Sequence, residues 1–378
     1  MKKVAILYLN TGGGHIGYAR ALEKGIKRKN SDVDVVLINP LEDRLVLKTI
    51  IEDGFSVTTK NDYTGYVFDE LAKIWDYKLP RKISDTVFTL TLYTYFQSLF
   101  KKQKFDYVIS THFFLSGPAW SLLKKSPYST FFHLVADPLS PHEIWFDIKD
   151  CHYIVESEKV KNMALKYAIP KSLIKVIPMI LDEKFTTTLS LPEQESFKRS
   201  LNLSVKEQVV LLIGGGEGIP NGKNIVKQLL AYPFLSKQLR FFVVCGKNEE
   251  LYASLTELLE GHSKAKQFEI IGFSKQVYEL MNIADVVLCK AGPATVFEVI
   301  SQGKPMIIYK KFGPQEEGNV DFVLEHGCGI YESNSAFLPG LIDGLLLSDA
   351  ARKSMQENIK KLDYHNGLDG CVDYIFSH

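Results

Sequence analysis

The chain has 378 residues, of which 46% are hydrophobic and 24% are charged, with a formal net charge of +1 at pH 7. This is an ordinary soluble composition, long enough for two α/β domains. No apolar run reaches the roughly 20 residues of a membrane-spanning helix, and the five scattered cysteines predict buried free thiols of a reducing compartment rather than a zinc or iron–sulfur site.

The first segment predicts a strand, a glycine-rich turn, a helix and a second strand. The strands are expected at Val4–Leu9 and Val33–Ile38, with the helix at Ile16–Lys29 between them. The apolar start is short and ends in a glycine loop, so we interpret it as a strand rather than a signal peptide. This βαβ order predicts a parallel sheet with a right-handed crossover.

The turn after the first strand is a candidate site. Gly12, Gly14 and Gly17 satisfy the dinucleotide-binding pattern, but the second strand ends in Asn39, where a nicotinamide enzyme needs an acidic residue. His15 follows the turn at the ligand-binding edge of the sheet. Its ordinary pKa lies near neutrality, so it is suited to take a proton from an alcohol. The alternative is that it caps the helix or packs near the turn.

Residues 41–104 interleave aromatic and basic side chains. Two interpretations stay open: helices packed on the sheet, or an interfacial surface with rings at headgroup depth and lysines on acidic lipids. Residues 1–104 carry 17 Lys and Arg against 12 Asp and Glu, a net charge of +5. This charge suits an anionic lipid surface better than nucleic acid.

Two further strands are expected at Phe105–Ser110 and Phe131–Val135, and each is followed by polar residues. His112 follows the first of these strands. It is expected either to contact the acceptor or donor, or to be a structural histidine. Asp137 follows the second strand, where it either orients His15 or binds acceptor hydroxyls. The carboxyl ends of parallel strands meet at one edge, so these side chains are expected to line a cleft.

The second half of the chain predicts another domain. Strands at Tyr153–Val155 and Val176–Pro178 complete the first sheet, and the polar segment Leu181–Ser196 predicts an interdomain linker. A strand at Val209–Ile213 then ends in a glycine run, Gly214–Gly216. Glycines there allow the backbone to approach a ligand closely.

A second strand, glycine turn and helix unit follows. An apolar run ends at Lys290, Gly292 and Pro293 break it, and Thr295 is placed to help cap the next helix. The unpaired amides and positive dipole end of such a helix bind phosphate. One turn later, Glu298 offers a carboxylate for ribose hydroxyls.

The loop Gly313–Asn319 follows the next strand and adds amides and carboxylates beside the same helix end. These groups match the hydroxyls of a sugar. Phosphate, ribose and sugar contacts together indicate a nucleotide sugar.

These motifs resemble those of the monogalactosyldiacylglycerol synthase and processive diacylglycerol glucosyltransferase family. The peptidoglycan enzyme that adds N-acetylglucosamine to lipid I is similar more distantly. The motifs that carry the resemblance occur in the same order over most of the chain: Gly12–His15, Asp137–Phe146, Lys290–Thr295 and Gln315–Asn319.

The resemblance implies roles for particular residues. His15 is the implied catalytic base, with Asp137 as the second catalytic residue. The implied donor-binding residues are Gly214, Gly215, Gly216, Phe273, Gly292, Pro293, Ala294, Thr295, Glu298, Gln315, Glu316 and Asn319. The implied acceptor-binding residues are Gly14, His112, His142 and Trp145, although Trp145 is equally suited to the core. Met179 and Ile180 stand where the family often has an arginine, so any role of that arginine is absent or moved.

The resemblance also implies the fold: two doubly wound, Rossmann-like α/β domains facing each other across a cleft, the glycosyltransferase B fold. We expect an acceptor- and membrane-facing domain at 1–185, to which the tail 362–378 returns, and a nucleotide-sugar-binding domain at 196–361.

The implied activity is inverting transfer of a hexose from UDP-glucose or UDP-galactose to diacylglycerol or a glycosyldiacylglycerol. The expected location is the cytoplasmic face of an anionic membrane, without a nucleic-acid partner. No cofactor or metal is expected, because helix-end amides can stabilise the departing UDP. The alternatives are transfer of N-acetylglucosamine to a polyprenyl-linked acceptor and a UDP-sugar 2-epimerase.

Overall fold

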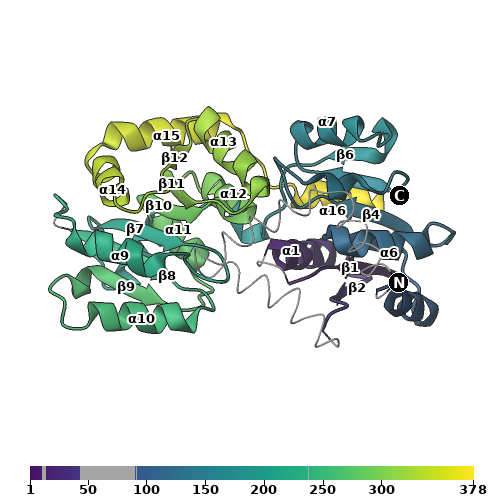
Figure 1. The fold of residues 1–378 in the computed structure, drawn as a ribbon, viewed down its shortest axis with the longest axis horizontal. Helices are drawn as coiled ribbons and strands as arrows, with labels where there is room; N and C mark the ends of the chain where they lie inside the picture. The colour runs from purple at the N-terminus through teal and green to yellow at the C-terminus, as the bar shows by residue number, and fades with distance from the viewer. Residues whose placement is uncertain (11–13, 43–89, 91, 237) are drawn as a thin grey trace.

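The computed structural model describes residues 1–10, 14–42, 90, 92–236 and 238–378. It has two lobes, each built on a six-stranded sheet with helices packed against it (Figure 1). The predicted pair of doubly wound α/β domains is therefore confirmed as a fold class. Most of the aromatic and basic segment 41–104 lies outside the described residues, so both interpretations of it remain predictions.

The first sheet has the strand order β2-β1-β3-β4-β5-β6, and all its pairs are parallel. The strands are β1 (Lys2–Leu7), β2 (Val33–Ile38), β3 (Tyr107–Ser110), β4 (Thr130–Leu134), β5 (His152–Val155) and β6 (Ile174–Val176). From β1 the chain builds outward to β2 on one side and through β3 to β6 on the other. The strand order therefore reverses between β1 and β3.

The second sheet has the order β12-β11-β10-β7-β8-β9 and is also parallel throughout. Its strands are β7 (Gln208–Ile213), β8 (Leu239–Val244), β9 (Phe268–Ile271), β10 (Val286–Lys290), β11 (Met306–Lys310) and β12 (Gly329–Tyr331). The order reverses between β7 and β10. Doubly wound sheets bind ligands outside the carboxyl ends of the two strands at such a reversal.

The strands are buried because their sequences are apolar almost throughout. Val4–Leu7 of β1 and Val209–Leu212 of β7 are fully buried. Continuous apolar runs are typical of parallel strands covered on both faces. This pattern is why the predicted strand bounds lie within two residues of the observed ones.

The helices largely occupy the expected places. The α-helices are α1 (Gly14–Lys29), α6 (Phe113–Leu123), α7 (Glu158–Lys166), α8 (Leu191–Ser200), α9 (Gly222–Ala231), α10 (Glu249–Leu259), α11 (Val277–Ile283), α12 (Pro293–Ser301), α13 (Glu317–Glu325), α14 (Leu338–Leu347), α15 (Asp349–Lys361) and α16 (Leu368–Phe376). The 3-10 helices are η2 (Glu143–Phe146), η3 (Lys171–Leu173), η4 (Glu183–Thr186), η5 (Ala265–Gln267) and η6 (Pro314–Glu316). Among the described helices, none is both long and apolar enough to cross a membrane.

The segment predicted as a linker contains a helix that the sequence analysis missed. Helix α8 begins at Leu191, and Ser190 and Glu193 form a capping box at its start. Serine followed three residues later by glutamate is a recognised start signal, so this helix was predictable. The expected boundary at residue 196 falls inside α8, and the domain bounds themselves stay predictions.

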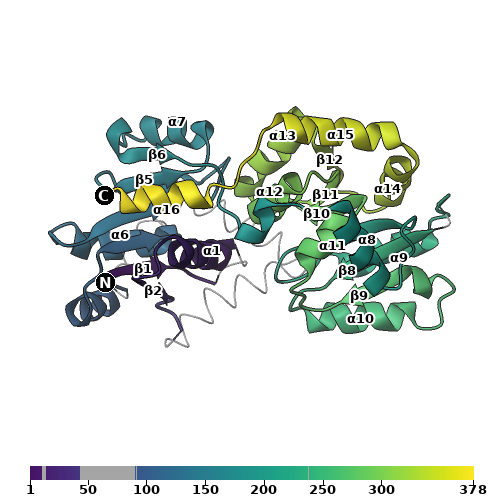
Figure 2. The same cartoon turned by 180° about the vertical axis from the view of Figure 1, so that it is seen from behind.

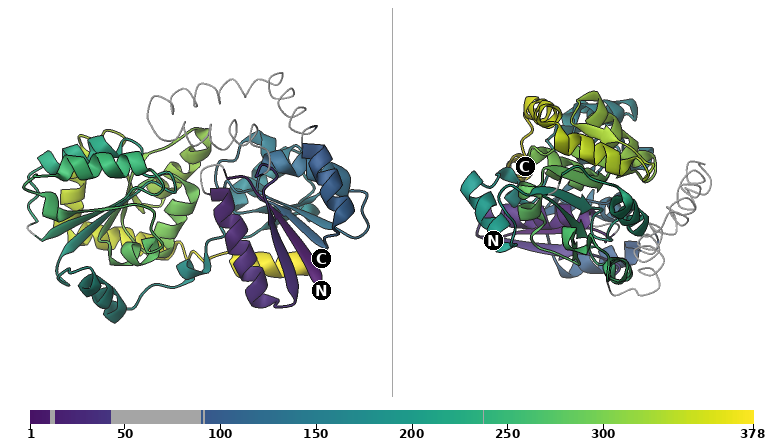
Figure 3. Two further views of the ribbon diagram at one scale, coloured as in Figure 1. Left: turned by 90° about the horizontal axis from the view of Figure 1, so that it is seen from below. Right: turned by 90° about the vertical axis from the view of Figure 1, so that its left-hand side faces the viewer.

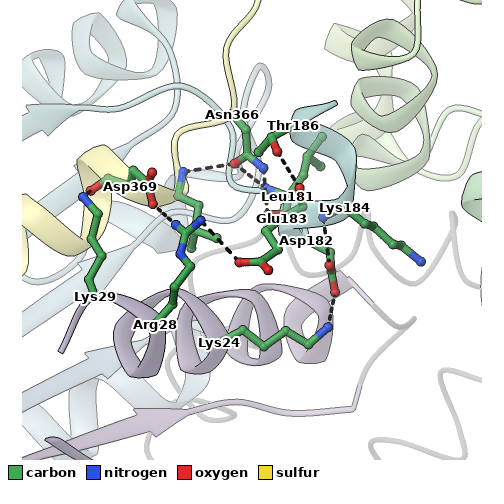
Figure 4. Close-up of polar contacts among 11 residues, drawn as sticks. Lys24, Arg28, Lys29, Leu181, Asp182, Glu183, Lys184, Thr186, Asn366 and Asp369 are labelled. Atoms are coloured by element: carbon green, nitrogen blue, oxygen red, sulfur yellow. Dashed lines mark hydrogen bonds and ion pairs between the residues drawn. The ribbon is translucent and has the colours of Figure 1, made fainter. Parts of the chain in front are cut away.

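In the described part of the chain, two segments run between the lobes: the teal segment before α8 and the yellow segment before α16 (Figure 3, left). Helix α16 lies in the lobe of the first sheet, beside α1 (Figure 2). On α1, Arg28 pairs with Asp369 of α16, and Lys24 pairs with Asp182 at 2.6 Å (Figure 4). Lys29 of α1 pairs with Asp373 of α16 at 2.7 Å. These pairs are solvent-exposed, so each contributes little to stability.

The segment before α16, which leads the chain back to the first lobe, is also held by hydrogen bonds to a backbone carbonyl. Gly367 donates its N–H to the Met179 carbonyl at 3.1 Å, and the Tyr364 hydroxyl donates to the same carbonyl at 2.7 Å. A Cβ atom on Gly367 would stand only 1.8 Å from the Pro178 carbonyl oxygen. The two crossing segments therefore touch at a point where only glycine fits.

We expect Gly367→Ala to destabilise the protein by about 1–3 kcal/mol or more, because backbone atoms must move to admit the methyl group. Gly370→Ala is the matched control, since nothing lies within 4 Å of its Cβ position and it lies inside α16. That change should stabilise by about 0.5–1 kcal/mol, the helix-propensity difference. Chemical denaturation of both variants tests the contrast, and equal stability of the two would contradict it.

Candidate active site

The predicted site residues gather at the two strand-order reversals. In the first sheet, His15 follows β1 and His112 follows β3, the two strands that flank the reversal. In the second sheet, the run Gly214–Gly216 follows β7 and Gly292 follows β10, which flank the other reversal. Sequence motifs far apart in the chain are thereby brought to the ligand-binding edge of each sheet.

His15 is held by a backbone group that the sequence analysis did not single out. Its Nδ1 lies 2.6 Å from the Thr111 carbonyl oxygen. A carbonyl only accepts hydrogen bonds, so Nδ1 carries the ring proton and Nε2 keeps a free lone pair. Burial lowers the pKa of His15 to about 4, partly opposed by the bond to Thr111. The imidazole is therefore neutral at pH 7, as a general base must be.

His112 is a buried residue whose ring packs against that of His15. It is 3% exposed, its Nδ1 accepts from Phe114 N at 3.3 Å to cap α6, and its ring centroid lies 4.4 Å from that of His15. Burial also holds its pKa well below the ordinary histidine value. The structure thus gives His112 a capping and packing role, and a direct acceptor contact stays a prediction.

Asp137 does not orient His15. Its Oδ2 accepts from the Trp145 indole N–H at 2.7 Å, and the Thr111 carbonyl holds the histidine instead. Burial raises the pKa of Asp137 to about 6, the Trp145 bond opposes this shift, and nearby Glu316 adds to it. The remaining predicted role for Asp137 is to bind acceptor hydroxyls.

Trp145 and His142 hold this edge of the first sheet in shape. Trp145 is 1% exposed, so it is a core residue that positions Asp137. His142 caps η2, because its Nδ1 accepts from Ile144 N at 3.2 Å. Gly14 begins α1, directly before His15.

On the second sheet, the glycine loop after β7 folds tightly on itself. Gly215 has a positive φ of 94°, and a Cβ atom on Gly214 would stand 2.0 Å from the Gly218 carbonyl oxygen. A Cβ atom on Gly216, in contrast, meets nothing within 4 Å. The loop thus needs Gly214 and Gly215 for its own conformation, whereas a side chain at position 216 would meet open space.

The turn after β10 opens helix α12 as predicted, with one correction. Gly292 is the N-cap residue and Pro293 the first helical residue, but no side chain caps the helix. Thr295 lies within the first turn and is buried, so its hydroxyl does not cap α12 as we expected. The amides of Ala294 and Thr295 belong to the unpaired first turn of the helix.

Glu298 lies one turn further along α12. Its carboxylate makes no hydrogen bond with the described residues of the chain, and it is half-buried. Burial raises its pKa to about 7, with Lys184 of η4 opposing the shift and Asp182 adding to it. A half-buried carboxylate without hydrogen-bond donors is suited to receive hydroxyl groups from a ligand.

The Gln315–Asn319 loop contains two buried polar side chains, Glu316 and Asn319. Glu316 is buried, and its two oxygens accept from Lys290 Nζ and Phe312 N, both at 2.7 Å. Asn319 is 1% exposed and donates to the Ala291 carbonyl at 2.8 Å. Asn319 therefore links α13 to the β10–α12 turn. This structural contact was not predicted, because the sequence suggested that Asn319 contacts the sugar.

The acceptor edge and the donor edge touch each other. Ser140 Oγ donates to the Gln315 carbonyl at 2.8 Å and accepts from Gly318 N at 3.0 Å. The charge of Glu316, on the donor edge, is close enough to raise the pKa of Asp137 on the acceptor edge. Ser140 was missed because an isolated serine in a loop carries no sequence signal.

Two further observations complete the site. Phe273, expected to bind the donor, is 64% exposed just after edge strand β9. Within the described ranges, no group of three or more His, Cys, Asp or Glu side chains could hold a metal ion.

Two doubly wound sheets, with a neutral histidine at one reversal and two glycine turns at the other, match the arrangement expected of a glycosyltransferase of the B-fold class. The comparisons agree. The family model described as "Monogalactosyldiacylglycerol (MGDG) synthase" matches residues 15–179, and that of the "Glycosyltransferase family 28 C-terminal domain" matches residues 209–367. Over most of its length the chain is therefore similar to the monogalactosyldiacylglycerol synthases and processive diacylglycerol glucosyltransferases.

Individual relatives are similar over most of this chain. The processive diacylglycerol beta-glucosyltransferase of Bacillus pumilus is 26% identical over 361 residues, covering 96% of this chain and 91% of the relative. The probable monogalactosyldiacylglycerol synthase 3 of Oryza sativa subsp. japonica is 27% identical, covering 96% and 71%. For monogalactosyldiacylglycerol synthase 1 of Arabidopsis thaliana, 27% identical, the match covers 88% of this chain and only 62% of the plant enzyme.

Solved structures are similar in fold. The crystal structure of Acinetobacter baumannii MurG has a TM-score of 0.64 at 16% identity, with 100% of both chains covered. Anabaena Alr3699/HepE in complex with UDP-glucose has a TM-score of 0.58 at 14% identity, again with 100% of both chains covered.

Proposed function

We propose that this enzyme transfers a hexose from UDP-glucose or UDP-galactose to diacylglycerol, or to a glycosyldiacylglycerol, at a membrane surface. One observation carries the proposal. The neutral His15 at the first reversal and the glycine turns at the second belong to edges that touch through Ser140, Gln315 and Gly318. The relatives' names supply the substrate class.

The reaction proceeds as a single displacement with inversion. The Nε2 lone pair of His15 takes the proton of the acceptor hydroxyl while its oxygen bonds to the anomeric carbon. The bond from that carbon to the diphosphate oxygen breaks, and its electron pair leaves with UDP. Amides at the start of α12 and in the Gly214–Gly216 loop stabilise the charge that develops on UDP. Asp137 binds acceptor hydroxyls, and Glu298 binds the ribose.

The acceptor is a lipid, so the enzyme works at the membrane. The proposed location is the cytoplasmic face, with the N-terminal lobe against anionic lipid. The net charge of +5 over residues 1–104 supports this orientation.

A donor screen tests the function. Radiolabelled UDP-glucose, UDP-galactose and UDP-N-acetylglucosamine are each supplied with vesicles that contain or lack diacylglycerol. We expect labelled lipid from one of the two hexose donors, only with diacylglycerol. Labelled lipid from UDP-N-acetylglucosamine on a polyprenyl-linked acceptor would favour the second transferase. Release of an epimerised UDP-sugar without any lipid would favour the epimerase.

Turnover is expected to survive an excess of EDTA, because backbone amides and the helix dipole carry out the charge stabilisation. Initial rates with and without chelator measure this directly. Activity that disappears in EDTA and returns with magnesium would contradict the proposed site.

A further inference from the structure

Lys290, the last residue of β10, places a cation beside the predicted diphosphate position. Its ammonium lies where the two glycine turns converge. A Cβ atom on Gly292 would stand 2.6 Å from Lys290 Nζ, and one on Gly215 would stand 3.7 Å from Lys290 Cε. One side chain therefore reaches both the N-cap of α12 and the loop after β7.

The ammonium of Lys290 makes one hydrogen bond and has further N–H donors to offer. It donates to Glu316 Oε1 at 2.7 Å and lies 5.9 Å from the centre of the Phe312 ring. A lysine ammonium carries three N–H donors, and among the described residues Glu316 is its only hydrogen-bond acceptor. The remaining donors are available to an anion at the turns.

The partner of Lys290 is anchored independently. Glu316 is 8% exposed at its side chain, and its second oxygen accepts from Phe312 N at 2.7 Å. A buried ion pair pays a desolvation penalty and is weak evidence for a stabilising role. A pair placed beside two phosphate-type turns is better explained by a ligand that can replace one partner.

We propose that Lys290 is the cationic ligand of the donor's diphosphate, and that Glu316 holds its ammonium in place until the diphosphate replaces it. The exchange moves the lysine donors to the phosphate oxygens and leaves the Glu316 carboxylate for the sugar hydroxyls. The proposal rests on the proposed function and names the group that neutralises the departing UDP, beyond the amides already described.

Calorimetry with UDP and with uridine tests this assignment. Lys290→Met should weaken UDP binding by about 10- to 100-fold, the effect of losing a charge-assisted hydrogen bond. Uridine affinity should not change, since uridine lacks the diphosphate. Lys290→Arg, which keeps the charge, should retain more UDP affinity than Lys290→Met.

The matched control is Lys311→Met. Lys311 makes an ion pair of the same 2.7 Å length with Glu317, but on the surface, with 35% and 56% of the two side chains exposed. Its loss should leave UDP affinity unchanged. Glu316→Gln should bind UDP more tightly than the wild type, because the lysine is no longer held by a carboxylate.

Lys290→Met leaves Glu316 buried without its partner, so the double variant Lys290→Met/Glu316→Gln keeps the test valid if the single variant melts early. The double variant should show the same selective loss of UDP over uridine. UDP affinity within about threefold of wild type, or an equal loss for uridine, would overturn the proposal. A wild-type enzyme that binds no UDP would overturn the proposed function itself.

Discussion

His15→Ala is expected to lower kcat by roughly 10²- to 10⁴-fold, the usual contribution of a general base. UDP affinity should be retained, because the residues predicted to bind UDP lie on the second sheet. The structure strengthens the expectation, since the Thr111 carbonyl fixes the tautomer that leaves Nε2 free. Initial rates at saturating substrate and calorimetry with UDP measure the two quantities.

The control for this variant is His326→Ala. His326 is the exposed C-cap residue of α13, and its loss should leave kcat unchanged. If His15 only packs at the start of α1, its alanine variant should instead lose about 1 kcal/mol of stability and keep most of its activity. A fully active His15→Ala enzyme would remove the base from this position.

The pH dependence of the rate separates His15 from Asp137 as the base. Burial lowers the pKa of His15 to about 4, so a histidine base stays active until the pH falls to that value. Asp137, whose pKa burial raises to about 6, would lose its activity as a base two pH units earlier. The folded pKa of His15 lies below the ordinary 6.5, so its contribution to stability is lost as the pH falls from about 6.5 towards 4.

Glu298→Ala is expected to weaken UDP binding by about 2–4 kcal/mol, the value of two charge-assisted hydrogen bonds to the ribose. This corresponds to roughly 30- to 1000-fold in the dissociation constant. The fold should be little affected, because the carboxylate makes no hydrogen bond within the described chain. Calorimetry and thermal melting of one preparation check both statements.

The raised pKa of Glu298 adds a second signature. Hydroxyl donors stabilise the charged carboxylate, so UDP binding should release a proton from the fraction that is protonated near pH 7. UDP affinity should therefore fall as the pH drops below about 7, and this dependence should vanish in Glu298→Gln. Equal UDP affinity of wild type and Glu298→Ala would remove Glu298 from the donor site.

The buried strands were predictable because their sequences are continuous hydrophobic runs, as in β7 and β10. The placement of the glycine turns and of His15 at the sheet edges was predictable, because each follows a predicted parallel strand. The order of the strands was not, since local patterns do not encode which strands lie side by side. The reversals between β1 and β3 and between β7 and β10 explain why these motifs meet.

Other parts of the site depend on contacts between residues distant in sequence. Thr111 acts through its backbone carbonyl, which every residue has, so no side-chain pattern marks it. Asn319 and Trp145 are polar or amphipathic residues that the fold buries against specific partners, so their types suggested ligand contacts. The ion pair of Lys290 and Glu316 joins residues that only the packed second lobe brings together.

The most direct test of hexose transfer to a lipid is the proton NMR spectrum of the chloroform-extracted product formed from the preferred UDP-hexose and diacylglycerol. We expect the hexose bonded to the glycerol hydroxyl to have the β anomeric configuration, because a single displacement inverts the α linkage of the donor. An α-linked product, or the absence of any hexose in the lipid fraction, would contradict this expectation.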